Sequence, residues 1–385
     1  MNLSPTARRR AGTTIATLAT AALVAPLAAG IPAGAASGRS SAGATAAAPA
    51  AAGLDKVSGK LRSPRGLAVV DGDTFLVAVA SGKILRIRDN DGKRTRTTVG
   101  QVHRQFIAPS VDRHGGRIYV LTPEGPPGTG AATLYRFKAG HKPKKLADIA
   151  AYQQRDPDPY DREDNPGESN PFGLAVLDNG AVLVADAAGN DLLRVSPKGK
   201  VSTVARLKPR TVTVPKHLPR VIKDPEGGSV HIKKAGQKMR AEAVATSVTV
   251  GDDGYWYVGE LRGVPATPKT SQVWRIKPGT RDAVCDPRHP RKGDCKRYAD
   301  GLTSVVDLAA DDSGDIYAAE LSRKSWLKWE LGRKGAKIGR ITRIDEDREL
   351  DRIQRLRLPG NVDTDDSDVY VTNPVFGRGA IRLID

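Results

Sequence analysis

The sequence is poor in aromatic residues and in cysteine. Aromatic side chains make up only 5% of its 385 residues, and there are two cysteines. Two cysteines exclude a disulfide-dense scaffold and a four-cysteine zinc site. Beyond the N-terminal region, no segment approaches the roughly 20 apolar residues that a membrane-spanning helix needs. The hydrophobic content of 39% is still enough for a sizeable core, so the composition excludes wholesale disorder.

The first 36 residues have the three parts of a secretory signal peptide. Arg8, Arg9 and Arg10 give a positive start, residues 15–29 form an apolar run, and residues 33–35 match the A-x-A cleavage pattern. A transmembrane anchor is the alternative interpretation, but the apolar run is shorter than a spanning helix requires. The sequence therefore predicts a secreted, extracytoplasmic protein. The general secretory route is favoured, and the twin-arginine route, which the consecutive arginines also permit, is the alternative. We expect no integral membrane segment after signal cleavage.

The remainder of the chain repeats one phrase six times. The phrase is a short alternating strand, a polar turn with Gly or Asp, and a second alternating strand. The copies begin at Gly66, Ser110, Gly173, Ser247, Asp307 and Asn361. A third strand with an arginine between apolar residues follows each copy, at Arg86, Arg136, Arg194, Arg275, Arg343 and Arg382. A fourth short strand comes next, for example at residues 201–204.

Four antiparallel strands per unit, repeated six times, are typical of an all-β, six-bladed β-propeller. A β-sandwich is the alternative fold, but it does not explain the sixfold recurrence. The last copy ends at Asp385 after only three strands, so we expect residues 56–62 to supply the fourth and remove the open edge. Residues 37–54 are mainly Ala, Ser and Gly, and we expect a flexible linker there. The propeller is thus expected to span residues 55–385.

Long connections fall mostly on one face of the expected ring. In a four-stranded blade, the connections between strands two and three and between blades share one face, which we call the top. Five long segments belong to it, namely residues 122–133, 152–170, 207–240, 261–271 and 321–337. Because functional residues concentrate on loops held by a rigid scaffold, we expect the top to be a binding face. Tolerated surface insertions are the alternative.

Several phrases carry a resemblance to a known family. They are residues 170–176, 184–193, 241–248, 257–261 and 302–309. These phrases resemble the ScyD/ScyE family, secreted bacterial propeller proteins named after members encoded with scytonemin pigment biosynthesis in cyanobacteria. The resemblance implies an NHL/TolB-like propeller and a secreted location, but no reaction. The Lys/Arg-rich insertions, and Ala245 where a proline is usual, depart from the family pattern.

Oxygen-bearing side chains recur where the second strands end. Four successive blades place Asp186, Glu260, Glu320 and Asn373 there, and Glu242 and Asp307 lie near the starts of first strands on the same face. Because Ca²⁺ takes six to eight oxygen ligands, these residues are a candidate Ca²⁺ site at the top of the central channel. Such an ion would act as a Lewis acid in a lactonase- or esterase-type hydrolase. The alternative is that these side chains bond backbone amides, since buried polar groups must be satisfied.

No catalytic nucleophile emerges from the sequence. The six histidines lie outside the repeated phrase, and no Gly-x-Ser-x-Gly motif is present. Catalytic residues therefore stay unassigned, and Ca²⁺ is the one candidate cofactor. Cys285 and Cys295 are expected to form a disulfide, because export places them in an oxidising compartment. A metal site at these cysteines is the alternative, but it would need a further ligand and a different spacing.

One top-face loop is acidic. Residues 152–168 include Asp156, Asp158, Asp161, Glu163, Asp164 and Glu168. Their spacing does not match an EF-hand. Three interpretations stay open: the loop binds Ca²⁺, it clamps the basic insertion, or it is an ordinary solvated loop.

Positive charge is concentrated in two insertions of a chain whose formal net charge is +18. Residues 198–240 have 12 Lys/Arg and two acids, and residues 323–340 have seven basic residues and one acid, with Trp326 and Trp329 among them. Basic residues with aromatics resemble a nucleic-acid surface, but an exported protein meets few nucleic acids. We expect an anionic cell-envelope polymer or another exported protein to dock there, which makes binding or scaffolding the leading function. A generally solvated basic surface is the alternative.

Overall fold

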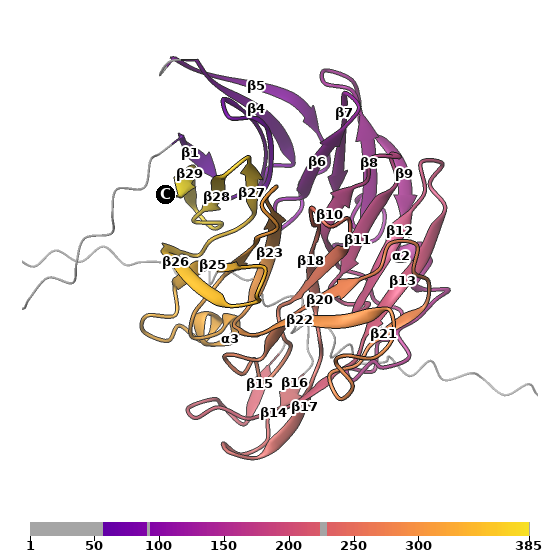
Figure 1. The fold of residues 1–385 in the computed structure, drawn as a ribbon, viewed down its shortest axis with the longest axis vertical. Coiled ribbons are helices and arrows are strands. Elements are labelled where there is room, and N and C mark those ends of the chain that lie inside the picture. The colour runs from indigo at the N-terminus through magenta and orange to yellow at the C-terminus, as the bar shows by residue number, and fades with distance from the viewer. Residues whose placement is uncertain (1–56, 91–92, 224–228, 385) are drawn as a thin grey trace, which may run out of the picture.

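The fold is an all-β ring of six blades around a central axis (Figure 1). The computed structural model describes residues 57–90, 93–223 and 229–384. Within these residues, six sheets have at least four strands each, and two two-stranded hairpins and two short helices complete the fold. No helix in this part of the chain is long and apolar enough to cross a membrane. The predicted six-bladed β-propeller with four antiparallel strands per blade is confirmed.

The blades follow one another along the chain. Blade 1 contains β2 (Pro64–Asp71), β3 (Thr74–Val79), β4 (Lys83–Asn90) and β5 (Lys93–Gln101). Blade 2 contains β6 (Ser110–His114), β7 (Arg117–Leu121), β8 (Thr133–Phe137) and β9 (Lys144–Asp148), and α2 (Ile149–Gln153) follows it. Blade 3 contains β10 (Pro171–Val176), β11 (Val182–Asp186), β12 (Asp191–Val195) and β13 (Val201–Leu207).

The second half of the ring is built in the same way. Blade 4 contains β18 (Ala245–Val250), β19 (Trp256–Glu260), β20 (Ser271–Ile276) and β22 (Cys295–Leu302). Blade 5 contains β23 (Val305–Ala310), β24 (Ile316–Glu320), β25 (Ile338–Ile344) and β26 (Leu350–Arg357), with α3 (Trp326–Glu330) between β24 and β25. Blade 6 contains β27 (Val362–Asp365), β28 (Asp368–Asn373), β29 (Arg378–Ile384) and β1 (Ser58–Arg62).

The polar turn of the repeated phrase closes the first hairpin of a blade. In blade 3, Asn179 Oδ1 accepts the N–H of Ala181 at 3.0 Å, and Gly180 has a φ of +75°. In blade 5, Asp311 Oδ1 accepts the N–H of Ser313 at 3.0 Å. The short carboxylate or amide side chain closes the turn, and glycine adopts the left-handed φ without a steric penalty. The same turn chemistry therefore sets the strand register in different blades.

An N-terminal strand closes the ring, as the sequence predicts. β1 runs antiparallel to β29, with Leu61 opposite Gly379. The innermost strands β2, β6, β10, β18, β23 and β27 contact one another in this order, and β27 contacts β2. The signal peptide predicted for residues 1–36 and the linker predicted for residues 37–54 lie outside the described residues, so both stay predictions.

The longest insertion forms two hairpins that extend past the rim of the ring (Figure 1). β14 (Arg210–Thr213) pairs with β17 (Lys238–Ala241), and β15 (Val221–Lys223) pairs with β16 (Ser229–His231). We call residues 208–223 and 229–240 the basic lobe. Its buried side chains Val214 and Ile232 belong to the same apolar cluster as Leu261 and Trp326 of two other top-face connections. The lobe is therefore packed against the propeller by its apolar side.

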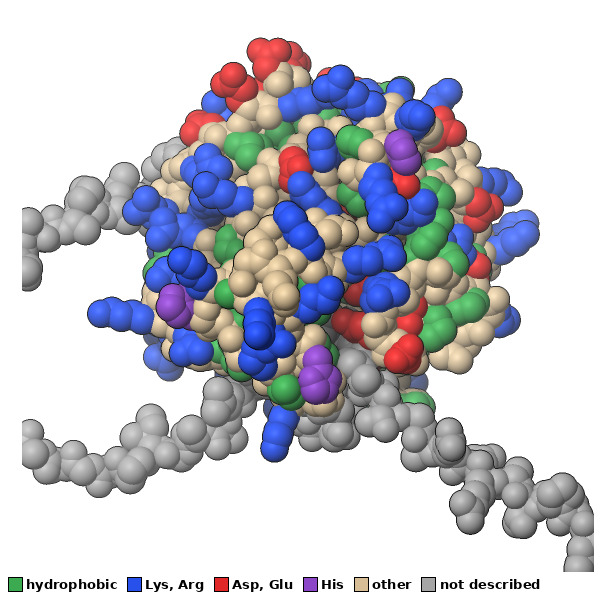
Figure 2. Space-filling model, turned by 90° about the horizontal axis from the view of Figure 1, so that it is seen from below, with side chains coloured by type: hydrophobic (Ala, Val, Ile, Leu, Met, Phe, Trp, Pro, Cys, Tyr) green, Lys and Arg blue, Asp and Glu red, His purple; other side chains and the backbone are tan. Residues whose placement is uncertain are grey.

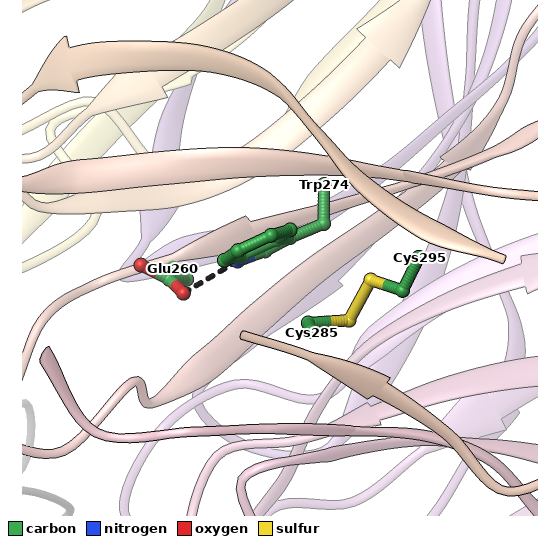
Figure 3. The surroundings of a disulfide bond; sticks show 4 residues. All are labelled: Glu260, Trp274, Cys285 and Cys295. Atoms are coloured by element: carbon green, nitrogen blue, oxygen red, sulfur yellow. Dashed lines mark hydrogen bonds between the residues drawn. A yellow bond between two sulfur atoms is a disulfide. The ribbon is translucent and has the colours of Figure 1, made fainter. Parts of the chain in front are cut away.

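The predicted disulfide joins two blades (Figure 3). Cys285 lies on β21 (Ala283–Cys285), which runs parallel to β13 as a fifth strand of blade 3. Cys295 begins β22, the outer strand of blade 4. Both cysteines are buried. The bond therefore ties the outer edge of blade 3 to blade 4, in addition to closing the loop that the sequence indicates.

Candidate functional site

Side chains close the top of the central channel. Arg65 of β2 donates from Nη1 to the carbonyl oxygen of Ala108 at 3.0 Å and from Nη2 to that of Phe172. Its guanidinium carbon lies 3.6 Å from the centre of the Phe172 ring. Arg65 is 3% exposed and Phe172 is 2% exposed. Burial lowers the pKa of Arg65 to about 9, and the charge of Asp307 opposes this fall.

Little free volume remains beside Arg65 and Phe172. Residues of blades 1, 3, 5 and 6, together with Ile107, surround a void of about 10 Å³. A void of this size holds about one water molecule at most. Enlarging this void to the size of a substrate would therefore require its lining side chains, Arg65 and Phe172 among them, to move.

Three aspartates, of which Asp307 is buried and Asp112 and Asp363 are half-buried, connect the first strands of neighbouring blades. Their carboxylates accept backbone N–H groups from the next blade, with Asp112 bonded to Val176 at 2.7 Å, Asp307 to Val362 at 2.9 Å and Asp363 to Val69 at 2.7 Å. Burial raises the pKa of these groups, to about 6 for Asp112, 8 for Asp307 and 7 for Asp363. Asp307, a predicted site residue, thus contributes to the contact between blades 5 and 6.

Two other predicted site residues, Glu260 and Glu320, are held by partners in their own blades. Trp274 Nε1 donates to Glu260 at 2.6 Å (Figure 3), and Arg262 donates to the other carboxylate oxygen. Arg340 donates to both oxygens of Glu320, at 2.6 and 2.8 Å. Both glutamates are fully buried. Burial raises the pKa of Glu260, and the charge of Arg262 opposes the rise.

Asp186 and Asn373 end β11 and β28 at the equivalent place and also have partners. Asp186 accepts hydrogen bonds from Ser169 Oγ at 2.6 Å and from the Asn170 N–H at 2.7 Å. Asn373 Oδ1 accepts one from Arg382 Nε at 2.8 Å. Burial raises the pKa of Asp186, and the hydrogen bond from Ser169 counteracts it. These side chains therefore stabilise the connections between strands.

Glu242 differs from the other predicted site residues. It is 5% exposed, and neither of its carboxylate oxygens has a hydrogen-bond partner of good geometry within the part of the chain that the structure describes. Burial, followed by the charges of Asp158 and Asp161, raises its pKa to about 8. The backbone N–H and the charge of Arg162 partly offset this rise. The structure therefore brings Glu242 to the acidic loop, which the sequence treats as a separate feature.

The acidic loop is tied to blade 3. Asp156 accepts hydrogen bonds from Arg206 Nη2 and Thr203 Oγ1 of β13, both at 2.5 Å. Asp158 accepts one from Asn190 Nδ2 at 3.1 Å, and burial raises its pKa to about 6. Arg206 lies within the basic segment 198–240, but on the blade itself. The contact thus anchors the loop to the propeller.

The hypothesis of a shared Ca²⁺ stays a prediction. Across residues 57–90, 93–223 and 229–384, no group of three or more His, Cys, Asp or Glu side chains is arranged to hold a metal ion. The predicted residues are instead distributed over blade joints and the acidic loop. The residues predicted to hold the ion are Asp186, Glu242, Glu260, Asp307, Glu320 and Asn373.

The basic lobe presents its charges to solvent. Its ion pairs lie at its base, where Arg210 meets Asp300 at 2.7 Å and Lys208 meets Asp286 at 3.0 Å. Farther out, exposed basic side chains have no ion-pair partner among the residues that the structure describes, namely Lys216, Arg220, Lys223, Lys233 and Lys234. Figure 2, seen from the side of the lobe, shows Lys and Arg side chains predominating over acidic ones. Within the described residues, the outer part of the lobe therefore presents positive charge that no ion pair neutralises.

The second basic insertion adjoins the lobe. Arg333 Nη2 donates to the carbonyl oxygen of His217 at 3.4 Å. Lys324, Lys334 and Lys337 in the same insertion are exposed. The two positive segments, which are far apart in the sequence, therefore meet on one surface.

The tryptophans of the second insertion are not open stacking platforms. Trp326 is fully buried and donates to the carbonyl oxygen of Arg262 at 2.8 Å. Trp329 is half-buried and stacks on Phe376, with ring centres 4.9 Å apart. The basic and aromatic pattern in the sequence thus separates into a charged surface and an apolar support beneath it.

Solved structures with a similar fold are β-propeller proteins. A gluconolactonase from Xanthomonas campestris is 13% identical, with a TM-score of 0.50 over 86% of this chain and 89% of that chain. The PQQ-bound aldose sugar dehydrogenase from Streptomyces coelicolor is 13% identical, with a TM-score of 0.49 over 88% of this chain and 99% of that chain. Virginiamycin B lyase from Staphylococcus aureus is 15% identical, with a TM-score of 0.45 over 86% of this chain and 99% of that chain. At such identities the likeness shows the fold alone. No family model and no curated protein matches the sequence.

Proposed function

We propose that the protein is an exported, ScyD/ScyE-like propeller that acts as a binding or scaffold protein, with the basic lobe holding an anionic polymer of the cell envelope. The observation that carries this proposal is the set of exposed lysines on the lobe that have no ion-pair partner among the described residues. An array of unneutralised charge attracts a polyanion over several ångströms and releases counterions on binding. The apolar packing beneath the lobe keeps the array in place.

The lobe favours recognition of charge density over recognition of one chemical group. Lys216, Lys233 and Lys234 carry compact ammonium charges on flexible stems, which do not form the fixed bidentate contacts of arginine. Binding should therefore weaken steeply with salt, because exposed charges are screened. A polymer with regularly spaced anionic groups fits such a surface better than a small anion does.

The test is binding of polyphosphate, a soluble polyanion, measured by titration calorimetry at several salt concentrations. The triple variant Lys216→Gln, Lys233→Gln, Lys234→Gln should bind about tenfold more weakly or worse than the wild type. The matched control is Lys138→Gln, Lys142→Gln, Lys144→Gln, which removes three exposed lysines from blade 2. An equal loss in both triple variants, or binding that resists high salt, would contradict the proposal.

The alternative function is a Ca²⁺-dependent lactonase- or esterase-type hydrolase with its site at the top of the channel. It is supported by the oxygen-bearing side chains at the ends of second strands. It is weakened by the small void beside Arg65 and by the hydrogen bonds of Glu260 and Glu320. Calcium-dependent hydrolysis of a lactone, lost on Glu260→Gln, would favour the hydrolase over the polymer-binding protein.

A further inference from the structure

A cleft opens beside blade 2, and its lining comes from residues 106–170. Its volume is about 960 Å³, at the upper end of the range of small-molecule sites. One wall is the β7–β8 connection around residues 123–131, and the opposite wall is residues 165–170. The sequence marks these segments only as long top-face connections, so the cleft between them is a finding of the structure.

The two walls of the cleft are held together. The N–H of Glu124 donates to Asn170 Oδ1 at 3.2 Å, which joins the β7–β8 connection to the opposite wall. Gln154 Nε2, which follows α2, donates to the carbonyl oxygen of Gly167 at 2.7 Å. The cleft is therefore formed before any ligand arrives, which reduces the ordering cost of binding.

The charged side chains of the lining already have partners. Lys145 pairs with Asp148 at 3.3 Å. Glu124 and Glu168 also line the cleft, and neither of them is free. An ionic ligand that enters the cleft would lose water without meeting a free charge of the opposite sign, which is unfavourable. The lining therefore favours a neutral ligand.

Side-chain amides of the lining, in contrast, have unused hydrogen-bonding groups. Asn170 is 1% exposed, and the bond from the Glu124 N–H identifies which amide atom is Oδ1. Asn170 Nδ2 has no acceptor among the described residues, although this side chain lines the cleft. A donor without an acceptor is costly in so buried a side chain, and a ligand oxygen would remove this cost.

A second amide and an aromatic ring line the same cleft. The half-buried side chain of Asn165 has no hydrogen-bond partner within the part of the chain that the structure describes. Phe106 is 53% exposed, the largest exposure of any big apolar side chain in the described residues. The face of an aromatic ring carries negative charge and attracts polarised C–H groups. The cleft thus offers neutral hydrogen bonds together with an apolar ring.

We propose that this cleft binds a neutral oligosaccharide. Hydroxyl groups both donate and accept hydrogen bonds, as do the amides of Asn165 and Asn170. The C–H face of a sugar ring would lie against Phe106. The volume of about 960 Å³ leaves room for more than one sugar ring. A site that hydrogen-bonds the hydroxyls of its ligand discriminates against analogues that lack them.

This site is independent of the basic lobe. The lobe is proposed to hold a polyanion through charge, whereas the cleft binds a neutral ligand through hydrogen bonds and ring contact. The outcome of the cleft experiment therefore does not depend on whether the lobe binds a polymer.

The test uses three neutral trisaccharides, cellotriose, maltotriose and chitotriose, titrated against the full chain and observed by saturation-transfer NMR. Sorbitol, which has hydroxyls but no ring, and cyclohexanol, which has a ring but one hydroxyl, are the control ligands. We expect at least one trisaccharide to bind about tenfold more tightly than either control ligand. Its binding should not change with salt, because the ligand is uncharged.

Three variants test the residues of the site. Phe106→Ala should weaken trisaccharide binding about two- to tenfold, the size of an aromatic contact. Asn170→Asp keeps an oxygen for the Glu124 N–H and removes both amide donors, so binding should weaken about tenfold. Asn165→Ala removes an amide that bonds nothing else in the described residues, so it should weaken binding without lowering the melting temperature.

Two control variants separate the site from general effects. Val284→Ala shortens another exposed apolar side chain, on β21, and Gln354→Ala removes a half-buried amide on blade 5. Neither should change trisaccharide binding. Absence of binding for all three trisaccharides, equally tight binding of sorbitol or cyclohexanol, or binding that survives Phe106→Ala, Asn165→Ala and Asn170→Asp would overturn the proposal.

Discussion

Arg65 of blade 1 lies over the ring of Phe172 of blade 3, with its guanidinium carbon 3.6 Å from the ring centre. The two residues belong to blades that are separated in the ring by blade 2, so their contact links two blades that are not neighbours. The arginine also donates to the carbonyl oxygens of Ala108 and Phe172. The top of the channel is consequently a packed joint.

Removing the charge of Arg65 should destabilise the ring. Arg65→Met keeps most of the side-chain volume but leaves the carbonyl oxygen of Ala108 without its side-chain donor and takes one of two side-chain donors from that of Phe172. It also removes the positive charge that lowers the pKa of Asp307. We expect a loss of about 3 kcal/mol in the free energy of unfolding, measured by urea denaturation. Arg88→Met, at an exposed position of blade 1, is the matched control. Equal stability of the two variants would show that the arginine does not hold the channel closed.

Glu242 should make stability depend on pH. Its pKa is about 8 in the folded protein against an ordinary value of 4.5, so between these values the folded state binds a proton that the unfolded state lacks. Stability therefore falls as pH rises through this window. Glu242→Gln removes this contribution, and the decrease in melting temperature from pH 5 to 8.5 should become smaller. The exposed variant Glu346→Gln should keep the wild-type slope, and a wild-type slope in Glu242→Gln would refute the assignment.

The disulfide should stabilise the joint between blades 3 and 4. Cys285 and Cys295 are separated by 10 positions in the sequence, and a loop of that length gives about 2 to 3 kcal/mol in the chain-entropy model. Reduction should lower the melting temperature of the wild type. The double variant Cys285→Ser, Cys295→Ser should have this lower melting temperature without any reductant, and adding the reductant should not change it. A wild type that is insensitive to full reduction would contradict the role of the bond.

Glu320 should behave as a structural carboxylate. Glu320→Gln removes the charge that Arg340 contacts with two hydrogen bonds, so we expect a loss of about 2 kcal/mol. This loss should be the same in calcium-free buffer and with millimolar Ca²⁺, as measured by urea denaturation. If Ca²⁺ stabilises the wild type and the variant abolishes that gain, the calcium hypothesis is favoured instead.

The fold could be predicted from the sequence because every blade repeats the same type of turn and the same strand pattern. The phrases at Gly173 and Ser247 are enough to define two hairpins, and the missing fourth strand of the last copy predicts the pairing of β1 with β29. The disulfide followed from the cysteine count and the expected compartment. Its role between blades did not, because β21 is three residues long and joins β13 across a long stretch of chain.

The candidate site was harder to predict from the sequence, because the same type of residue can either stabilise the fold or take part in chemistry. The sequence places Glu260 and Glu320 at strand ends, but only the structure shows that Trp274 and Arg340 occupy their oxygens. Arg65 lies just before the repeated phrase, and no local pattern indicates that it reaches Phe172 in another blade. Contacts between blades depend on the closed ring, which local sequence does not encode.

Lysine footprinting tests most directly whether the basic lobe is the binding surface. The protein is acylated with a lysine-reactive reagent, with and without polyphosphate, and the modified positions are read by mass spectrometry. We predict that Lys216, Lys233 and Lys234 become protected, while Lys138 and Lys142 on blade 2 react as before. Equal protection at both sets, or protection confined to blade 2, would contradict the assignment of polymer binding to the lobe.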